Sequence, residues 1–129
     1  MGLYESNYLR LAHLAGDLRA LPDSSVSVVE GDCTLMLSVC ERARYTSELL
    51  LTYLLPATQP PAALERVPDL RLRLYHDARL LEARGDGGAA PERELHRCWN
   101  RNMMVNKWLE YCAERGHGFV RGAIERPTS

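Results

Sequence analysis

The spacing of hydrophobic residues changes along the chain, and each change marks a different kind of element. After Ser6, which we expect to be an N-cap, apolar residues recur at helical spacing until Pro22. From Ser25 the period becomes two, and Val26 alternates with serines up to a turn signal at residues 31–32. The pattern therefore predicts an N-terminal helix followed by a strand.

Four further stretches are also compatible with strands. Residues 34–44 predict a second strand, and residues 45–55 predict a third. Prolines then indicate one long irregular loop that runs past Pro68. Residues 70–75 give the cleanest strand signal in the chain, and residues 78–84 predict a further strand or a bent extension. Together these stretches predict an antiparallel sheet of four to five strands.

A long amphipathic helix is predicted between Pro91, which suits a first turn, and Gly116, which suits a helix end. Its apolar stripe consists of Leu95, Cys98, Val105, Leu109 and Cys112. A helix, a run of strands and a second helix favour an α+β fold, with the C-terminal helix packed on the sheet. We expect one domain over residues 1–118 and a loose tail over residues 119–129.

Composition narrows the class of protein. A chain of 129 residues with 46% hydrophobic residues has room for one core, and a formal net charge of -1 argues against a protein that coats nucleic acid. No secretion signal or membrane-spanning stretch is evident, so we expect a cytoplasmic protein. The four cysteines have no CxxC spacing, which predicts free thiols and no metal. No cofactor is predicted.

No familiar catalytic motif occurs in the chain. His76 and Asp77 form a tempting pair, but neighbours on a strand point to opposite faces and cannot act jointly. We expect Asp77 to be a structural polar residue that bonds to nearby backbone at a strand bend. An enzyme is therefore disfavoured.

The candidate ligand-binding residues are arginines, which make up all the basic residues except Lys107. Arg71, Arg73 and Tyr75 are predicted to share the strand face opposite the leucines, and Arg42 and Arg44 to share a face of their own strand. Two interpretations stay open. The face is solvated and holds ion pairs, or it is a guanidinium platform for phosphate or a stacked base. A genomic bias toward arginine would also explain the composition.

Arg93, Arg97 and Arg101 repeat every four residues and form a ridge on the long helix. Like charges at this spacing repel, which suggests compensation by carboxylates or by an anionic partner. Asn102 falls near the middle of the apolar stripe, where a buried amide must find partners. We expect Asn102 to be a structural polar residue bonded to the sheet backbone.

Three strings of sequence carry a resemblance to a known family: Arg44-Tyr45-Thr46, residues 73–78 (RLYHDA) and residues 108–112 (WLEYC). They resemble the YqiB-like proteobacterial proteins, a domain of unknown function. The resemblance covers about Leu3 to Gly118, and Asn102 also matches a family position. It implies a bacterial cytosolic setting and supplies no activity. The chain departs from the family pattern in being shorter around residues 85–91 and in carrying Arg101 where an apolar residue is usual.

Three hypotheses about function follow. The first is a non-enzymatic regulatory receptor for an anionic nucleotide, such as cyclic di-GMP, that acts through a protein partner such as a transcriptional regulator. The second is a protein–protein adaptor without a small-molecule ligand. The third is an enzyme acting on a phosphorylated small molecule. Nucleic-acid binding ranks below these, and the sequence leaves open whether the chain forms a homodimer.

Overall fold

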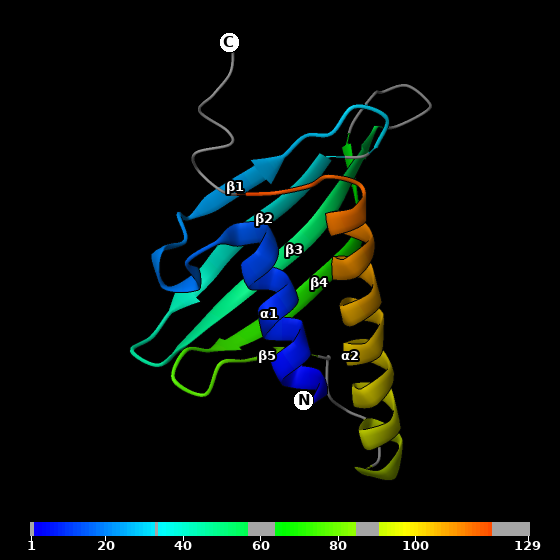
Figure 1. Cartoon of the computed structure of the whole chain (residues 1–129). Coiled ribbons are helices and arrows are strands. Elements are labelled where there is room, and N and C mark those ends of the chain that lie inside the picture. The colour runs from blue at the N-terminus through cyan, green and yellow to red at the C-terminus, as the bar shows by residue number, and fades with distance from the viewer. Residues whose placement is uncertain (1, 33, 57–63, 85–90, 120–129) are drawn as a thin grey trace.

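The structure is a computed structural model that describes residues 2–32, 34–56, 64–84 and 91–119, with side chains described outside residues 54–69 and 91–96. The elements, in chain order, are α1 (Leu3–Ala15), the 3-10 helix η1 (Leu18–Ala20), β1 (Ser24–Ser27), β2 (Thr34–Arg42), β3 (Thr46–Pro56), β4 (Leu64–Tyr75), β5 (Leu80–Ala83) and α2 (Pro91–Glu114). Figure 1 shows α1 and α2 side by side on the same side of the sheet. The predicted α+β architecture is confirmed.

The sheet is an antiparallel meander in which each strand pairs with its neighbours in sequence, in the order β1-β2-β3-β4-β5. Register is set by alternation: Leu37 lies opposite Leu51, and Leu72 lies opposite both Leu49 and Ala83. A slip of one residue would turn every leucine away from the helices, so the apolar pattern fixes the pairing.

The core lies between this leucine face and the two helices. Its fully buried side chains include Leu35, Leu49, Leu72 and Leu81 from the sheet, with Leu11, Leu14, Val105 and Leu109 from the helices. Each such side chain stabilises the fold by about 1.5–3 kcal/mol relative to exposure.

Two register shifts correct the predicted strand ends. The shift between Val39 and Glu41 precedes the end of β2 at Arg42, so Arg44 lies in the following turn and not on a strand. The shift between Thr52 and Leu54 falls opposite the part of β4 that contains Pro68. The prediction that a loop runs past Pro68 is wrong, because a strand accepts proline where the ladder is irregular.

The ends of the domain also differ from the prediction. The N-cap of α1 is Gly2 and not Ser6, and the Gly2 N–H donates to Glu5 Oε1 over 2.8 Å. Phe119, which we assigned to a loose tail, is buried, and its N–H bonds to Leu14 O. Burial of the large apolar ring of Phe119 stabilises this end of the chain against the domain. Residues 120–129 lie outside the described part of the chain.

Within the described residues, neither helix has the length and apolar character needed to cross a membrane.

Candidate functional site

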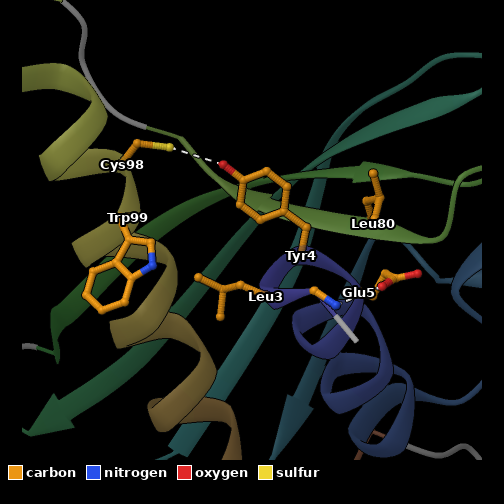
Figure 2. Close-up of a pocket in the computed structure, with 7 residues that line it drawn as sticks. Leu3, Tyr4, Glu5, Leu80, Cys98 and Trp99 are labelled. Atoms are coloured by element: carbon orange, nitrogen blue, oxygen red, sulfur yellow. Dashed lines mark hydrogen bonds between the residues drawn. The ribbon is translucent and has the colours of Figure 1, made fainter. Parts of the chain in front are cut away.

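An apolar pocket opens where the N-terminus of α1 meets β5 and the first half of α2. Its volume is about 460 Å³. It is lined by Gly2, Leu3, Tyr4, Glu5, Leu80, Cys98 and Trp99. Figure 2 shows Tyr4 reaching from α1 toward Cys98 on α2, with Leu80 contributed by β5. No pattern in the sequence predicts this pocket, because its walls come from three separate parts of the chain.

The polar groups of the pocket are neutral or already bonded. Tyr4 Oη lies 3.2 Å from Cys98 Sγ. This hydrogen bond, together with burial, raises the pKa of Tyr4 to about 12, so the phenol stays protonated at neutral pH. Trp99 is 58% exposed at the pocket. A half-exposed tryptophan beside an apolar hollow is typical of a recognition surface.

A network of three buried asparagines fixes the helices beneath the pocket. Asn102 does bond to the sheet backbone: its Oδ1 accepts from Ala83 N over 2.7 Å and from Asn7 Nδ2 over 3.3 Å. Asn7 also donates to Leu81 O, and Asn106 donates to Asn7 Oδ1 over 3.0 Å. The network ties α1, α2 and β5 together, so the three walls of the pocket are held in one arrangement.

The arginines of β4 emerge on the outer face of the sheet, opposite the leucines, as their parity predicts. Arg71 is exposed, and no ion pair to it is found within the described side chains. Arg73 is paired with Glu48 of β3, which raises the pKa of its guanidinium. Tyr75 donates to Glu82 Oε1 over 3.0 Å. Two of these three side chains therefore bond to carboxylates of neighbouring strands, as expected on the outer face of a sheet.

A smaller cavity of about 260 Å³ lies beside Arg73, where β2 ends and β3 begins. It is lined by Glu41, Ala43, Thr46, Glu48 and Arg73. Two carboxylates accompany its single guanidinium, and one of them already pairs with Arg73. A phosphate placed there would meet like charge, so this cavity disfavours an anionic ligand.

Arg42 and Arg44 do not share a strand face, so that prediction is wrong. Arg42 reaches back to Leu21 O over 2.8 Å and to Asp23 Oδ1 over 2.9 Å. Arg44 lies in the turn after β2, with its guanidinium 5.4 Å from the centre of the Tyr45 ring. Strand β2 ends at Arg42, so the alternation of a strand no longer relates the side chain of Arg44 to that of Arg42.

The helix ridge is separate from the arginines of the strands. Arg97 is exposed and Arg101 is half-buried on α2, while the side chain of Arg93 lies outside the described part. Helix α2 packs on the leucine face of the sheet, whereas Arg71 and Arg73 occupy the other face. The predicted arginines are thus not brought together around one ligand.

His76 and Asp77 lie in the turn after β4 and do not form a dyad. His76 is buried, with Nε2 2.9 Å from Ser47 Oγ. Burial, with the nearby positive charge of Arg19, lowers the pKa of His76, so its ring is neutral at pH 7. Asp77 pairs with Arg19 Nη2 over 2.8 Å. The expected bond from Asp77 to nearby backbone is replaced by this link to η1.

A buried cluster just beyond the C-terminal end of α2 was not predicted from the sequence. His117 Nδ1 lies 3.0 Å from Ser27 Oγ, and Nε2 lies 2.9 Å from Asp32 Oδ2. Tyr53 donates to the same carboxylate over 2.9 Å. Because a carboxylate only accepts, Nε2 of His117 must be the donor to Asp32. Sequence separations of 85 and 90 residues hid this cluster from any local motif.

The serine, histidine and aspartate in this cluster act as a clasp and not as a catalytic triad. The His117 side chain is fully buried, and Ser27 is 5% exposed. The Ser27 hydroxyl also accepts the Gly118 N–H over 2.9 Å. A nucleophile must be reachable by its substrate, and this hydroxyl is not. The clasp fastens the chain after α2 to β1.

The described cysteines and acidic residues do not assemble into a further candidate site. Cys40, Cys98 and Cys112 are free thiols, while Cys33 lies outside the described residues. Burial raises the pKa of Cys112 to about 11, which makes it unreactive at neutral pH. Within the part of the chain that the structure describes, no three His, Cys, Asp or Glu side chains form a group that could hold a metal ion.

Comparison with known proteins identifies relatives without an assigned role. Residues 10–118 match the family described as "Protein of unknown function (DUF1249)". The chain is 30% identical to the "Uncharacterized protein YqiB" of Escherichia coli strain K12, over 90% of this chain and 87% of that protein. The YqiB proteins of the O6:H1 and O157:H7 strains match equally well. No solved structure matches.

Proposed function

Since this chain belongs to the DUF1249 family, whose function is unknown, we propose a role from its own geometry: it is a non-enzymatic binding protein whose apolar pocket receives a side chain of a protein partner. The observation that carries this proposal is the pocket between α1, β5 and α2, with Trp99 exposed beside it. Pockets that bind small molecules usually have volumes of about 300–1,000 Å³, so this pocket has room for one side chain of a partner.

The lining indicates the chemistry of the partner. Leu3, Leu80 and Trp99 supply apolar walls, and Tyr4 presents a neutral ring. An aromatic or aliphatic anchor, such as Phe, Leu or Met, fits this lining. Glu5 is the one charged residue in the lining, and it is exposed. A basic residue beside the anchor would therefore complement the pocket.

Rigidity supports the same proposal. The asparagine network holds the pocket walls in place before any partner arrives. A preformed pocket loses little conformational entropy on binding, so a single anchor side chain can contribute usefully to affinity.

The pocket can be tested first with toluene, which represents the phenylalanine side chain. In an NMR titration we expect saturable shifts at the Trp99 indole N–H and the Leu80 methyl groups, and none at Met104. Met104 is 46% exposed on the same helix but does not line the pocket. Shifts that are absent, or that spread evenly over the surface, would argue against an apolar anchor site.

The partner itself is tested with variants in affinity capture from bacterial lysate. A stoichiometric partner bound by the wild-type chain should be lost with Trp99→Asp and kept with the matched variant Met104→Asp. Binding of the purified partner must then show the same dependence by calorimetry. A partner that ignores Trp99→Asp would remove this role from the pocket.

A receptor for an anionic nucleotide, with cyclic di-GMP as the specific ligand, is the second candidate. Its support is the exposed turn in which Arg44 lies over Tyr45, together with the exposed guanidinium of Arg71. Such groups can stack on guanine or bond to phosphate. Calorimetric titration with cyclic di-GMP should give binding that Arg44→Ala or Arg71→Ala weakens at least tenfold. A flat titration would eliminate this candidate.

The proposed setting is the bacterial cytosol. The three described cysteines are free, which fits a reducing compartment. The curated relatives are bacterial proteins. A transcriptional regulator is the kind of partner we propose for a nucleotide-responsive form of the protein.

A further inference from the structure

Strand β1 is a four-residue edge of the sheet that carries neither charge nor proline. Among the described residues it pairs with β2 alone. Residues 24–29 read Ser-Ser-Val-Ser-Val-Val, without a charge or a proline. Soluble proteins normally protect a sheet edge by keeping the strand very short or by adding charge, proline or a bulge, because its free N–H and C=O groups can pair with another strand. Of these devices β1 itself has only its short length, so its edge remains open to a partner of the same short length.

The side chains along this edge point to the same conclusion. Val26 is 47% exposed and Val28 is 76% exposed. Both are β-branched, which suits a paired strand better than an exposed loop. The outer face that continues from Val26 across β2 and β3 carries no charge through six positions, namely Ser24, Val26, Thr34, Met36, Ser38 and Leu50.

The helix side of β1 is already occupied. Ser27 bonds to His117 and to the Gly118 N–H, so residues 117–118 lie against that face. This contact is made by a side chain and not by the strand edge. A partner can therefore approach β1 in the plane of the sheet without displacing the clasp.

We propose that a second copy of this chain adds its own β1 to this edge, antiparallel and about a two-fold axis, so that two five-stranded sheets become one. A two-fold interface is self-complementary, and the uncharged edge meets no opposing charge in pairing with itself. The proposal does not depend on the apolar pocket, which lies between α1, β5 and α2 at the opposite edge of the sheet.

The residues define the register of this pairing. In an antiparallel pair, two residues that lie directly opposite each other point to the same face of the sheet. The two-fold axis must therefore pass between the two copies of one residue, which then lie opposite each other. Centring on Val26 places it against the partner's Val26, and Val28 against the partner's Ser24. Centring on Ser27 would need pairing out to Glu30, where the chain already turns at Gly31 with φ of 87°. The Val26 register covers both exposed valines within residues 24–28.

Cysteine cross-linking tests the register directly. Directly opposite residues lie about 4.5–5.5 Å apart, within reach of a disulfide. Val26→Cys, in a chain that also carries Cys33→Ser and Cys40→Ser, should form a dimer linked by a disulfide between the two copies of position 26 under mild oxidation. The matched control Ser24→Cys should not, because its two copies would lie roughly 13 Å apart along the strands. Cross-linking at position 24 in preference to position 26 would overturn the register.

The association is measured by analytical ultracentrifugation of the wild-type chain and of Val26→Lys. We expect a concentration-dependent dimer for the wild type and a monomer with an unchanged circular dichroism spectrum for Val26→Lys. A monomer at every concentration, or a dimer that survives Val26→Lys, would overturn the proposal. A dimer that appears only after deletion of residues 120–129 would also overturn it, since the chain's own tail would then be the natural occupant.

Discussion

Replacing Asn102 by alanine is the sharpest test of how the domain is held together. The side chain is completely buried and bonds to β5, to α1 and to its own helix. Asn102→Ala removes all three contacts at once. We compare it with Asn100→Ala, which changes an exposed residue of the same helix. Both changes raise helix propensity by the same amount, so that contribution cancels in the comparison.

The expected loss follows from the groups that are left without partners. The Ala83 N–H loses its acceptor in the core, which costs about 1–3 kcal/mol. Asn7 loses one acceptor but keeps Leu81 O, which adds about 0.5–1.5 kcal/mol. We therefore expect Asn102→Ala to be less stable than Asn100→Ala by about 2–4 kcal/mol.

Urea unfolding, followed by tryptophan fluorescence and by far-ultraviolet circular dichroism, measures the difference. The midpoint should fall while the dependence on urea concentration stays the same, because the surface exposed on unfolding hardly changes. A difference between the two variants below about 0.5 kcal/mol, the size of an ordinary surface effect, would refute the reasoning.

Three further predictions concern the remaining buried groups. Iodoacetamide at pH 7.5 should modify exposed Cys40 in the native protein and leave Cys112 unmodified until urea is added, because burial raises the pKa of Cys112 to about 11. Mass spectrometry measures the modification of each cysteine, and equal rates at the two positions would contradict this prediction. Burial lowers the pKa of His76 below its ordinary 6.5, so unfolding by urea should become easier as the pH falls from about 6.5 through the folded pKa, and His76→Gln should flatten that dependence; a dependence left intact in the variant would exclude His76 as its source. Finally, His117→Phe should accelerate hydrogen exchange at the Gly118 amide, whose acceptor Ser27 is held by that histidine; unchanged protection would mean that no clasp exists.

Alternation along a strand was the most informative pattern in the sequence. It placed Leu72 and Leu74 in the core and Arg71 and Arg73 on the other face, because side chains on a strand alternate between faces. The same reasoning failed for Arg44, because β2 ends at Arg42 and strand alternation does not apply in the turn that follows. The residue at which a strand ends has no reliable signal in a single sequence.

The buried face of a helix could be predicted from the sequence, whereas the distant side chains that meet around the pocket could not. Helical spacing alone located Asn102 on the apolar stripe, and its bond to Ala83 follows from burial. The pocket depends on Tyr4 meeting Cys98, which lies 94 residues away. Such a meeting depends on how the helices cross the sheet, and no local pattern records that geometry.

The meander has a consequence for how the chain is made. Each hairpin can zip to the previous one as the polypeptide leaves the ribosome, yet the leucines of the sheet receive α2 only after residues 91–114 have been synthesised. Until then the part of the leucine face that α2 covers is exposed to solvent, and the nascent chain is at its most prone to aggregate. Truncation within α2 should therefore yield insoluble material, and a chaperone that shelters emerging chains would be needed during that interval.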